Sequence, residues 1–427
     1  MPARRRACIL RRSCVLWRVQ RDISNTERAE LAGLFFLHGM AMAAWFVPLG
    51  TVLDSHGLQS IKPVAFATSA TAALVSPLIF GAMADRHVAP VRVLRWLALA
   101  TAAAMALAAT AIQRGASPWA VLALIQLHAL CSAPTWSLSN SIVLGRLQDS
   151  QRQFGPIRAV ATLGWMAGCW LVSALHADTS TTACYIGSGV WLLVAAFTRW
   201  LPSPAPLKST GSVTIRQRLG LDALTLLRNR DHRVVFLTAA LFSIPLAAFY
   251  PYTPTHLREL GLERTTAWMS LGQVTEIIAM VGLSSVLGRW KFKWTLGAGL
   301  TFGFVRYCLC AVDGKGWVLA GLTLHGFAFT LFFINAQIYL DQRIDPAWRV
   351  RAQALFGLMV GGVGNLIGYL GTGWWFRVCQ KGGGIDWTFF WGGLAAVLAL
   401  VLIFFVSTYR GRGAGQASSE LPRPSIS

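Results

Sequence analysis

The sequence contains few charged residues, and acids are the scarcest of them. Only 13% of its 427 residues are charged, and 17 Asp and Glu stand against 38 Lys and Arg. Soluble domains carry about 25% charged residues. The missing charge falls in apolar segments of roughly 20 residues, the length that a helix needs to cross about 30 Å of hydrocarbon. These features exclude an ordinary soluble domain and predict a protein that crosses a membrane many times.

Motifs for covalent chemistry and metal binding are also missing. The eight cysteines are scattered, without a CxxC pair or a Cys/His cluster, so neither a disulfide framework nor a zinc site is predicted. No glycine-rich loop precedes a Lys and a Ser or Thr, which argues against an ATP-driven pump. The sequence also lacks a paired-carboxylate site and a nucleophile elbow. It therefore predicts no enzyme activity and no cofactor.

Three histidines lie within the apolar runs, at His38, His128 and His325. They are too far apart in the sequence to indicate a joint metal site. Each alone is more often a hydrogen-bonded interior residue, although His38 and His325 could face a cavity.

The net charge of +21 raises the question of a nucleic-acid partner. The basic residues, however, lie in the tails and in the short segments between the apolar runs, which is the pattern of the positive-inside rule. The sequence therefore predicts the lipid bilayer, and no nucleic acid, as the partner of this charge.

Twelve apolar runs are predicted to span the membrane as helices. They are Leu31–Leu53, Pro63–Met83, Val93–Ile112, Trp119–Leu144, Pro156–Leu175, Thr182–Trp200, Val234–Pro254, Ala267–Leu287, Thr295–Val312, Trp317–Leu340, Ala354–Phe376 and Trp387–Thr408. The loops that join an even-numbered run to the next odd-numbered run hold sixteen Lys and Arg between them, and the loops that join an odd-numbered run to the next even-numbered run hold seven. This asymmetry predicts that both termini are cytoplasmic.

The longest break between runs divides the chain into two halves of six helices. We predict a basic cytoplasmic arm over 1–28, a first half over 29–200, a central cytoplasmic loop over 201–233, a second half over 234–408 and a cytoplasmic tail over 409–427. The arm carries eight arginines against two acids, and we expect a disordered segment or an over-long choice of start site.

This six-plus-six layout resembles the all-α fold of the major facilitator superfamily, whose binding site lies between the halves near the bilayer midplane. The segment from Gly81 to Arg86 supports the resemblance, because Gly81-x-x-x-Asp85-Arg86 matches a loop motif of that superfamily. We expect these three residues to latch neighbouring helix ends, with the glycine allowing close approach and the charged pair forming an ion pair.

Polar residues inside the runs indicate a ligand site. Arg158, Thr162 and Trp165 are spaced four and three residues apart, which puts them on one helical face, and Gln273 shares a face with Glu276 in the same way. Glu276 is the only acid within any of the runs. Charges at bilayer depth are costly and normally face a cavity or a partner.

The charged residues inside the runs can also be explained without a ligand site. Arg158 lies near a helix end and could extend its side chain to the interface. Glu276 could form a structural hydrogen bond, but burial favours the neutral form of a carboxyl group, so it could also bind and release a proton. Arg306 could form a structural pair with another residue, extend its side chain to the membrane interface, or have a functional role.

Four segments carry a specific combination of residues: Phe154-Gly-Pro-Ile-Arg158 followed by Thr162, Gly164 and Trp165; Leu219-Gly-Leu-Asp-Ala223; Met269-Ser270 with Gln273 and Glu276; and Arg351-Ala-Gln-Ala-Leu-Phe-Gly357. Two weaker motifs are Pro134-Thr135 with Asn140, and Phe332-Phe333 with Gln337. Taken together, these segments resemble the bacterial nucleoside:proton symporter family, and the resemblance runs from about Leu31 to Ser407.

The resemblance implies proton-coupled nucleoside uptake across the inner membrane by alternating access, and we expect a monomer. We predict Glu276 as the coupling acid, because no other acid lies within the apolar runs. The resemblance also implies a substrate site formed by seven residues, namely Arg158, Thr162, Trp165, Gln273, Glu276, His325 and Phe329. The chain departs from the family pattern at Ala247 and Tyr250, where the family can place amides, and at Thr330, where an aspartate is usual.

Two other functions remain open from the residues. One is a superfamily transporter of another polar solute, such as a sugar, a nucleobase or a nucleoside-like metabolite, with or without proton coupling. The other is a membrane sensor or assembly protein that binds a ligand without carrying it. Polar residues in both halves favour transport, because each half then contributes to a site that can close.

Overall fold

The computed structural model describes residues 24–84, 89–147, 150–201, 214, 216, 219–282 and 291–411. Its first half runs from the N-terminal side to residue 201. The helices of this half are α1 (Asn25–Phe46), α2 (Leu49–Ser55), a 3-10 turn (Gln59–Ile61), α3 (Lys62–Ala84), α4 (Pro90–Gln113), α5 (Pro118–Leu144), α6 (Ser150–Ala174) and α7 (Thr182–Phe197).

The second half begins with a 3-10 helix (Leu221–Arg228) and contains one small β-hairpin. Its elements are α9 (Arg230–Leu246), α10 (Phe249–Glu259), α11 (Thr265–Met269), α12 (Leu271–Gly282), α14 (Phe292–Ala311), α15 (Lys315–Phe329), α16 (Asn335–Arg343), α17 (Arg349–Gly357), α18 (Asn365–Val378), β1 (Gln380–Lys381), β2 (Gly384–Ile385) and α19 (Trp387–Thr408), with π-helical segments at Thr330–Ile334 and Leu358–Gly364. The hairpin is antiparallel and pairs Gln380 with Ile385.

Local sequence signals fix where several helices begin. Ser24 and Glu27 form a capping box at the start of α1, with the Glu27 N–H donating to Ser24 Oγ at 3.1 Å. Proline, which has no N–H to satisfy, occupies the first position of α4 and of α5. Asp386 caps α19, and the Phe389 N–H and Lys381 that bond to its carboxylate hold its pKa below the usual range.

Within the described residues, each of the twelve predicted runs falls on a helix or on consecutive helices, and the last five residues of the eighth run lie outside them. Eight helices or helix pairs in the described part of the chain are long and apolar enough to cross a membrane. The first run is interrupted at Pro48 and the seventh just after Pro245, because proline cannot donate to the helix ladder. The tenth and eleventh runs contain the two π-helical segments.

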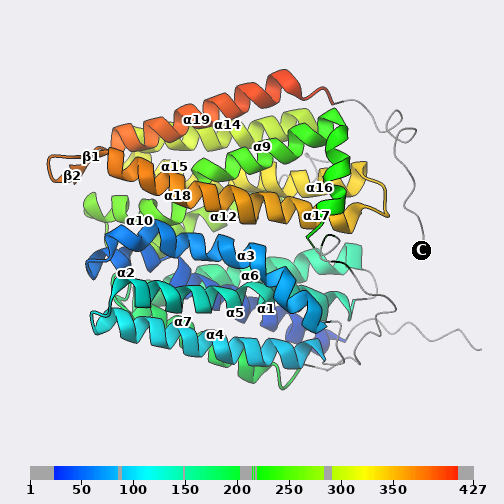
Figure 1. Ribbon diagram of the computed structural model, residues 1–427, viewed down its shortest axis with the longest axis horizontal. Coiled ribbons are helices and arrows are strands. Elements are labelled where there is room, and N and C mark those ends of the chain that lie inside the picture. The colour runs from blue at the N-terminus through cyan, green and yellow to red at the C-terminus, as the bar shows by residue number, and fades with distance from the viewer. Residues whose placement is uncertain are drawn as a thin grey trace, which may run out of the picture.

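The two halves form two helical bundles that lie side by side. In Figure 1 the helices α1–α7, coloured from blue through cyan to green, make the lower bundle, and the helices α9–α19, coloured from brighter green to red, make the upper one. Within the first bundle α1 packs on α6 and α7, and within the second α14 packs on α15 and α19. Across the boundary α3 packs on α18, α2 on α10, and α6 on α11 and α12.

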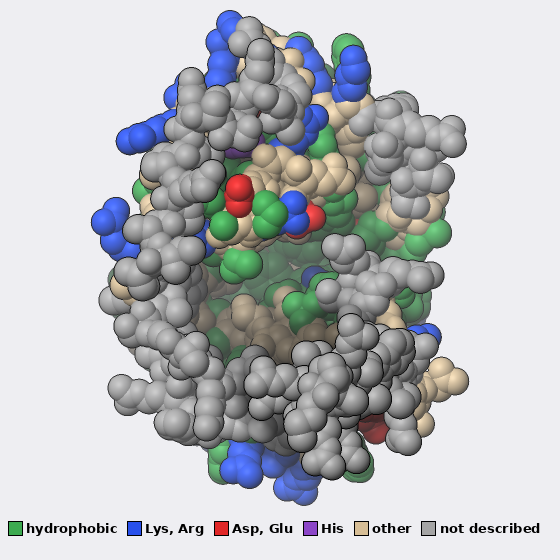
Figure 2. Space-filling model, turned by 90° about the vertical axis from the view of Figure 1, so that its right-hand side faces the viewer, with side chains coloured by type: hydrophobic (Ala, Val, Ile, Leu, Met, Phe, Trp, Pro, Cys, Tyr) green, Lys and Arg blue, Asp and Glu red, His purple; other side chains and the backbone are tan. Residues whose placement is uncertain are grey.

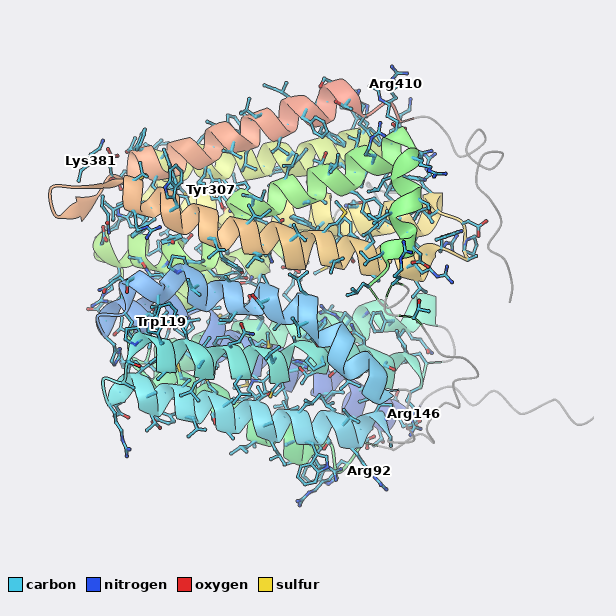
Figure 3. The ribbon with its side chains drawn as sticks, in the orientation of Figure 1. Arg92, Trp119, Arg146, Tyr307, Lys381 and Arg410 are labelled. Atoms are coloured by element: carbon cyan, nitrogen blue, oxygen red, sulfur yellow. The ribbon has the colours of Figure 1, made fainter. Side chains whose placement is uncertain are left out.

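The molecule has two chemically different ends. We call the end where α1 begins and α19 finishes the terminal end, and the end with the β1–β2 hairpin the hairpin end. Figure 3 shows Arg92, Arg146 and Arg410 at the terminal end, and Lys381 and Trp119 at the hairpin end. Many of the basic residues that follow even-numbered runs therefore gather at the terminal end.

Two of the motifs that carried the family resemblance meet at the terminal end. Asp222 Oδ2 lies 2.9 Å from Arg351 Nη1. Gly220 has a left-handed backbone conformation, with φ of 67°, and packs against the backbone of Arg351. A side chain at Gly220 would be strained by its φ and would collide with Arg351, so this contact requires glycine.

Some predictions fall on residues that the structure does not describe. The latch residues Asp85 and Arg86 lie outside the described residues, and Gly81 is described only as part of the α3 backbone. The basic arm is described only from residue 24, and the tail only to residue 411.

Candidate functional site

A cavity of about 430 Å³ lies between the two halves, within the range of about 300–1,000 Å³ that is typical of small-molecule sites. Residues from α1, α5 and α6 of the first half and from α9, α10, α12, α15 and α18 of the second line it. All seven residues singled out from the sequence are among them: Arg158, Thr162, Trp165, Gln273, Glu276, His325 and Phe329.

Helix α6 provides the wall from the first half, as the helical spacing predicted. The Arg158 guanidinium lies over the Trp136 ring, with Cζ 4.1 Å from its centroid. The Trp165 ring centroid is 5.9 Å from that of Tyr250 in the other half. Arg158 and Trp165 thus both line the cavity, and the indole N–H of Trp165 is a buried donor without a partner in the described structure.

Helix α12 provides the facing wall. Gln273 Nε2 donates to the Tyr250 hydroxyl at 3.5 Å, while Gln273 Oε1 is buried without a partner in the described structure. Glu276 attracts Arg158 electrostatically across the cavity. Among the residues that line the cavity, Glu276 is the only acid. An amide acceptor and a carboxyl group therefore face a guanidinium and an indole from the opposite half.

Helix α15 closes the third side with aromatic rings. The His325 ring stacks on Phe249 at 4.0 Å between centroids and 13° between planes, and the Phe329 centroid is 6.3 Å away. A Cβ at Gly326 would collide with the backbone nitrogen of Glu276, so glycine allows α15 to approach α12 closely. This approach places the aromatic side next to the carboxyl group.

One of the three residues at which the chain departs from the family pattern, Thr330, lies behind this wall, whereas Ala247 and Tyr250 line the cavity. Thr330 is 2% exposed and is not among the residues that line the cavity. Its hydroxyl is buried without a partner among the described residues, and its carbonyl accepts from Asn335 Nδ2 at 2.9 Å. Where the resemblance implies an aspartate, the chain therefore has a hydroxyl that makes no hydrogen bond with Glu276 in the described structure.

Other predictions about single residues are settled by their surroundings. His38 does not face the cavity, because it lies fully buried in the first half between Ser139 Oγ at 3.0 Å and Thr135 Oγ1 at 3.1 Å. His128 is likewise a buried residue that bonds to the Thr101 carbonyl at 3.2 Å. Arg306 is 1% exposed, so it does not extend to an interface.

Several residues that line the cavity were not predicted from the sequence, among them the aromatic residues Trp136 and Tyr369 and the amide Asn365. Asn365 gave a detectable signal, since amides are rare in these runs. Trp136 gave none, because one tryptophan among the 18 of the chain is uninformative without knowing which helices pack around it. Within the described residues, no group of three or more His, Cys, Asp and Glu could hold a metal ion.

The cavity continues toward the terminal end. A neighbouring space of about 770 Å³ shares Trp165, Tyr250 and Asn365 with it and extends to Gln353 and Leu219. Figure 2, which views the molecule from the terminal end, shows the surface hollowed between the halves, with apolar side chains inside the hollow and Lys and Arg on the surface above it. The site is therefore reached from the terminal end in this conformation.

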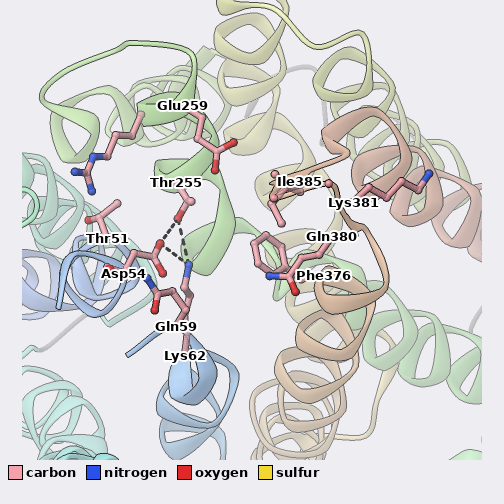
Figure 4. Close-up of a pocket in the computed structure, with 14 residues that line it drawn as sticks. Thr51, Asp54, Gln59, Lys62, Thr255, Glu259, Phe376, Gln380, Lys381 and Ile385 are labelled. Carbon is pink, nitrogen blue, oxygen red and sulfur yellow. Dashed lines mark hydrogen bonds and ion pairs between the residues drawn. The ribbon is translucent and has the colours of Figure 1, made fainter. Parts of the chain in front are cut away.

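At the hairpin end, by contrast, polar side chains join the two halves. Lys62 Nζ donates to Asp54 Oδ2 at 2.6 Å and to Thr255 Oγ1 at 3.3 Å, and the Thr255 hydroxyl donates to the same Asp54 oxygen at 2.8 Å (Figure 4). Lys62 is 2% exposed. We call Asp54, Lys62 and Thr255 the outer clasp. A separate space of about 910 Å³ lies beside it.

Further hydrogen bonds join α6 and the loop after it to the start of α11 and α12 on the same side. The Thr266 N–H donates to Asp178 Oδ1 at 2.7 Å, and the Ala267 N–H donates to Ser173 Oγ at 2.9 Å. Trp170 Nε1 donates to Ser270 Oγ at 2.9 Å. The halves are thus held together between the cavity and the hairpin end.

Two helical bundles around a central cavity that is lined by aromatic and polar side chains, open at one end and closed at the other, have the arrangement of transporters of the major facilitator type. Solved structures share the fold. A crystal structure of a mutant form of the nucleoside transporter NupG matches with a TM-score of 0.82 at 23% identity, covering 90% of this chain and 100% of that one. The POT family transporter PepTSo matches with a TM-score of 0.68 at 14% identity, covering 91% and 99%.

Sequence comparison narrows the class to a family. The model of the nucleoside H⁺ symporter family matches residues 26–412. The putative nucleoside transporter YegT of Escherichia coli (strain K12) is 32% identical over 90% of this chain and 93% of its own length. Xanthosine permease of the same strain is 27% identical over 88% and 94%. This chain belongs to the nucleoside:proton symporter family.

Family membership confirms the predicted family, the helical membrane fold and the transport function. It places the chain among multi-pass membrane transporters of bacterial type and outside the enzymes. The roles of the individual residues in the cavity are a separate matter, which rests on their geometry.

Proposed function

We propose that the protein imports nucleosides together with protons by alternating access, and that the central cavity binds both. The observation that carries this proposal is the convergence of seven polar and aromatic residues from both halves on one cavity of about 430 Å³. A site shared by the two halves can be opened to either side when they rock against each other.

Each wall of the cavity suits one part of a nucleoside. The vicinal ribose hydroxyls can donate to the unused Gln273 Oε1 and to Glu276, and the flat base can stack on Trp165 or Phe329. Carbonyl oxygens of the base can accept from Arg158. Two cavity groups without partners in the described structure, Trp165 Nε1 and Gln273 Oε1, support a polar ligand, because unpaired buried polar groups are costly.

The proton would bind to Glu276, the only acid among the lining residues. The open terminal end and the outer clasp indicate an inward-facing conformation if the terminal end is cytoplasmic. We propose that arrangement, in the cytoplasmic membrane, with both termini inside and a monomer as the working unit. The division into an arm, two halves, a central loop and a tail at 1–28, 29–200, 201–233, 234–408 and 409–427 is part of the same proposal.

Uptake of a panel of radiolabelled nucleosides tests this function. The protein would be produced in cells that lack nucleoside transporters of their own, and uptake would be measured with and without a protonophore. We expect concentrative uptake that the protonophore abolishes. If no nucleoside is taken up by cells that contain the protein in their membrane, the proposed function is wrong.

A second candidate, nucleoside transport without proton coupling, is favoured by one observation. Thr330 occupies the position where the family resemblance implies an aspartate, which leaves a single acid in the cavity. The protonophore separates the candidates, because an uncoupled carrier equilibrates nucleosides at the same final level with and without it.

A further inference from the structure

Arg306 is a buried cation that the proposed transport cycle does not use. It lies on α14, 1% exposed, with its guanidinium carbon 4.8 Å from the Phe249 ring centroid and 4.3 Å from that of Tyr307. In the described part of the chain no carboxylate lies within 4.0 Å of it. Burying a cation without an acid is costly, so this position calls for a function.

Its hydrogen-bond partner is a histidine of the cavity. Arg306 Nη1 lies 2.6 Å from His325 Nδ1. A guanidinium has only donors, so Nδ1 must accept and can carry no proton. The ring is then neutral, and its single proton is on Nε2.

The ring is also held in place. One face stacks on Phe249 at 4.0 Å and 13°. Helix α12 packs closely beside the ring, since a Cβ on Gly272 would come within 3.0 Å of His325 Cδ2. His325 lines the cavity, and Nε2 is the ring nitrogen without a protein partner in the described structure. The Nε2–H is thus a donor of fixed position on the aromatic side of the cavity.

We propose that Arg306 is a positioning residue that fixes His325 as an Nε2–H donor, and that this donor selects nucleosides whose base presents a carbonyl oxygen there. Arg306 does not line the cavity and acts only through His325. The inference rests on the proposed function, because it concerns the nucleoside that the same cavity binds.

The selection follows from matching donors with acceptors. A carbonyl oxygen accepts from Nε2–H, whereas an exocyclic amino group would place a second donor against it. Inosine and adenosine form a matched pair, since they carry an oxygen and an amino group at the same carbon of the purine. Uridine and cytidine differ in the same way on the pyrimidine.

The test is competition for a bound radiolabelled nucleoside on the purified full-length protein. The quantity compared is the ratio of the inhibition constants of adenosine and inosine, which does not depend on the amount of folded protein. A buried unmatched donor costs enough for a ratio of roughly ten- to hundredfold in favour of inosine. Uridine and cytidine should show the same direction.

Variants separate the positioning effect from packing. Arg306→Met frees Nδ1, lets His325 adopt either tautomer and should bring the ratio close to one, and His325→Phe should do the same. Arg306→Lys keeps a donor-only group and should restore part of the ratio. Thr323→Val is the control, because Thr323 lies on the same helix as His325, its hydroxyl bonds to the Ala320 carbonyl and it does not line the cavity, so the ratio should stay at the wild-type value.

If Arg306→Met does not reach the membrane, Arg306→Gln replaces it, because its amide both donates and accepts and also permits both tautomers. A wild-type ratio near one overturns the proposal, as does an unchanged ratio in the folded Met or Gln variant. Failure of the wild-type protein to bind any nucleoside would instead refute the proposed function.

Discussion

The sharpest consequence of the structure concerns the substitution Glu276→Gln. Glutamine keeps the size of the side chain and can still hydrogen-bond to a ribose, but it cannot carry a proton through the cycle. Because Glu276 is the only acid that lines the cavity, no other lining side chain can replace it as a carboxyl proton carrier. We expect the variant to lose concentrative uptake while it keeps exchange of internal for external nucleoside.

The size of the loss follows from the number of protons. One acid carries one proton, and one charge that moves through 100 mV gains about 2.3 kcal/mol. With about 1.4 kcal/mol for each factor of ten, this energy supports roughly fifty-fold accumulation at most. Glu276→Gln should lower the accumulation ratio from a value in this range to about one.

The assay is uptake into membrane vesicles with an imposed membrane potential, together with exchange measured in the absence of a potential. Glu263→Gln provides a matched control, because Glu263 is exposed near the hairpin end and does not line the cavity. Accumulation at the wild-type ratio in Glu276→Gln would refute the assignment of Glu276 as the coupling acid. Loss of exchange as well would show that the carboxylate is needed for binding and not only for coupling.

Three other substitutions test the cavity walls and the outer clasp. Trp165→Ala should weaken nucleoside binding by about 1–3 kcal/mol, the range for stacking of a base on an aromatic side chain, and an unchanged dissociation constant would exclude stacking at this residue. Arg158→Lys should fail to transport, because an ammonium lacks the planar fork of the guanidinium, and normal uptake would mean that the fork is not used. Lys62→Met should loosen the hairpin end. Pulsed EPR between spin labels at Gln59 and Lys381 should then show longer and more broadly distributed distances than in the wild-type protein. An unchanged distance distribution would mean that the outer clasp does not hold this end closed.

Helical periodicity made much of the cavity predictable. Arg158, Thr162 and Trp165 line it together because their spacing places them on one face of α6, and Gln273 and Glu276 share a face of α12 for the same reason. The cost of placing charge at bilayer depth made Glu276 conspicuous. Each of these arguments uses only residues within a single helix, so it can be made from the sequence without knowing how the helices pack.

Contacts between helices were not predictable in the same way. His38 and His325 look alike in the sequence, but one is enclosed by α5 and the other faces the cavity. The bond of Arg306 to His325 joins α14 to α15 and depends on how those helices pack. The outer clasp likewise depends on the contact of α2 and α3 with α10.

The distribution of charge in the cavity suggests how a proton can act on the two halves. Arg158 belongs to the first half and Glu276 to the second, and they attract each other across the cavity. Protonation of Glu276 removes this attraction and leaves the Arg158 charge without its counter-charge, so an acceptor-rich nucleoside becomes the better partner for the guanidinium. Release of the proton restores the attraction and competes with the substrate. Under the proposed function, a single acid that faces a cation from the other half would therefore link proton binding to substrate binding and to the approach of the halves.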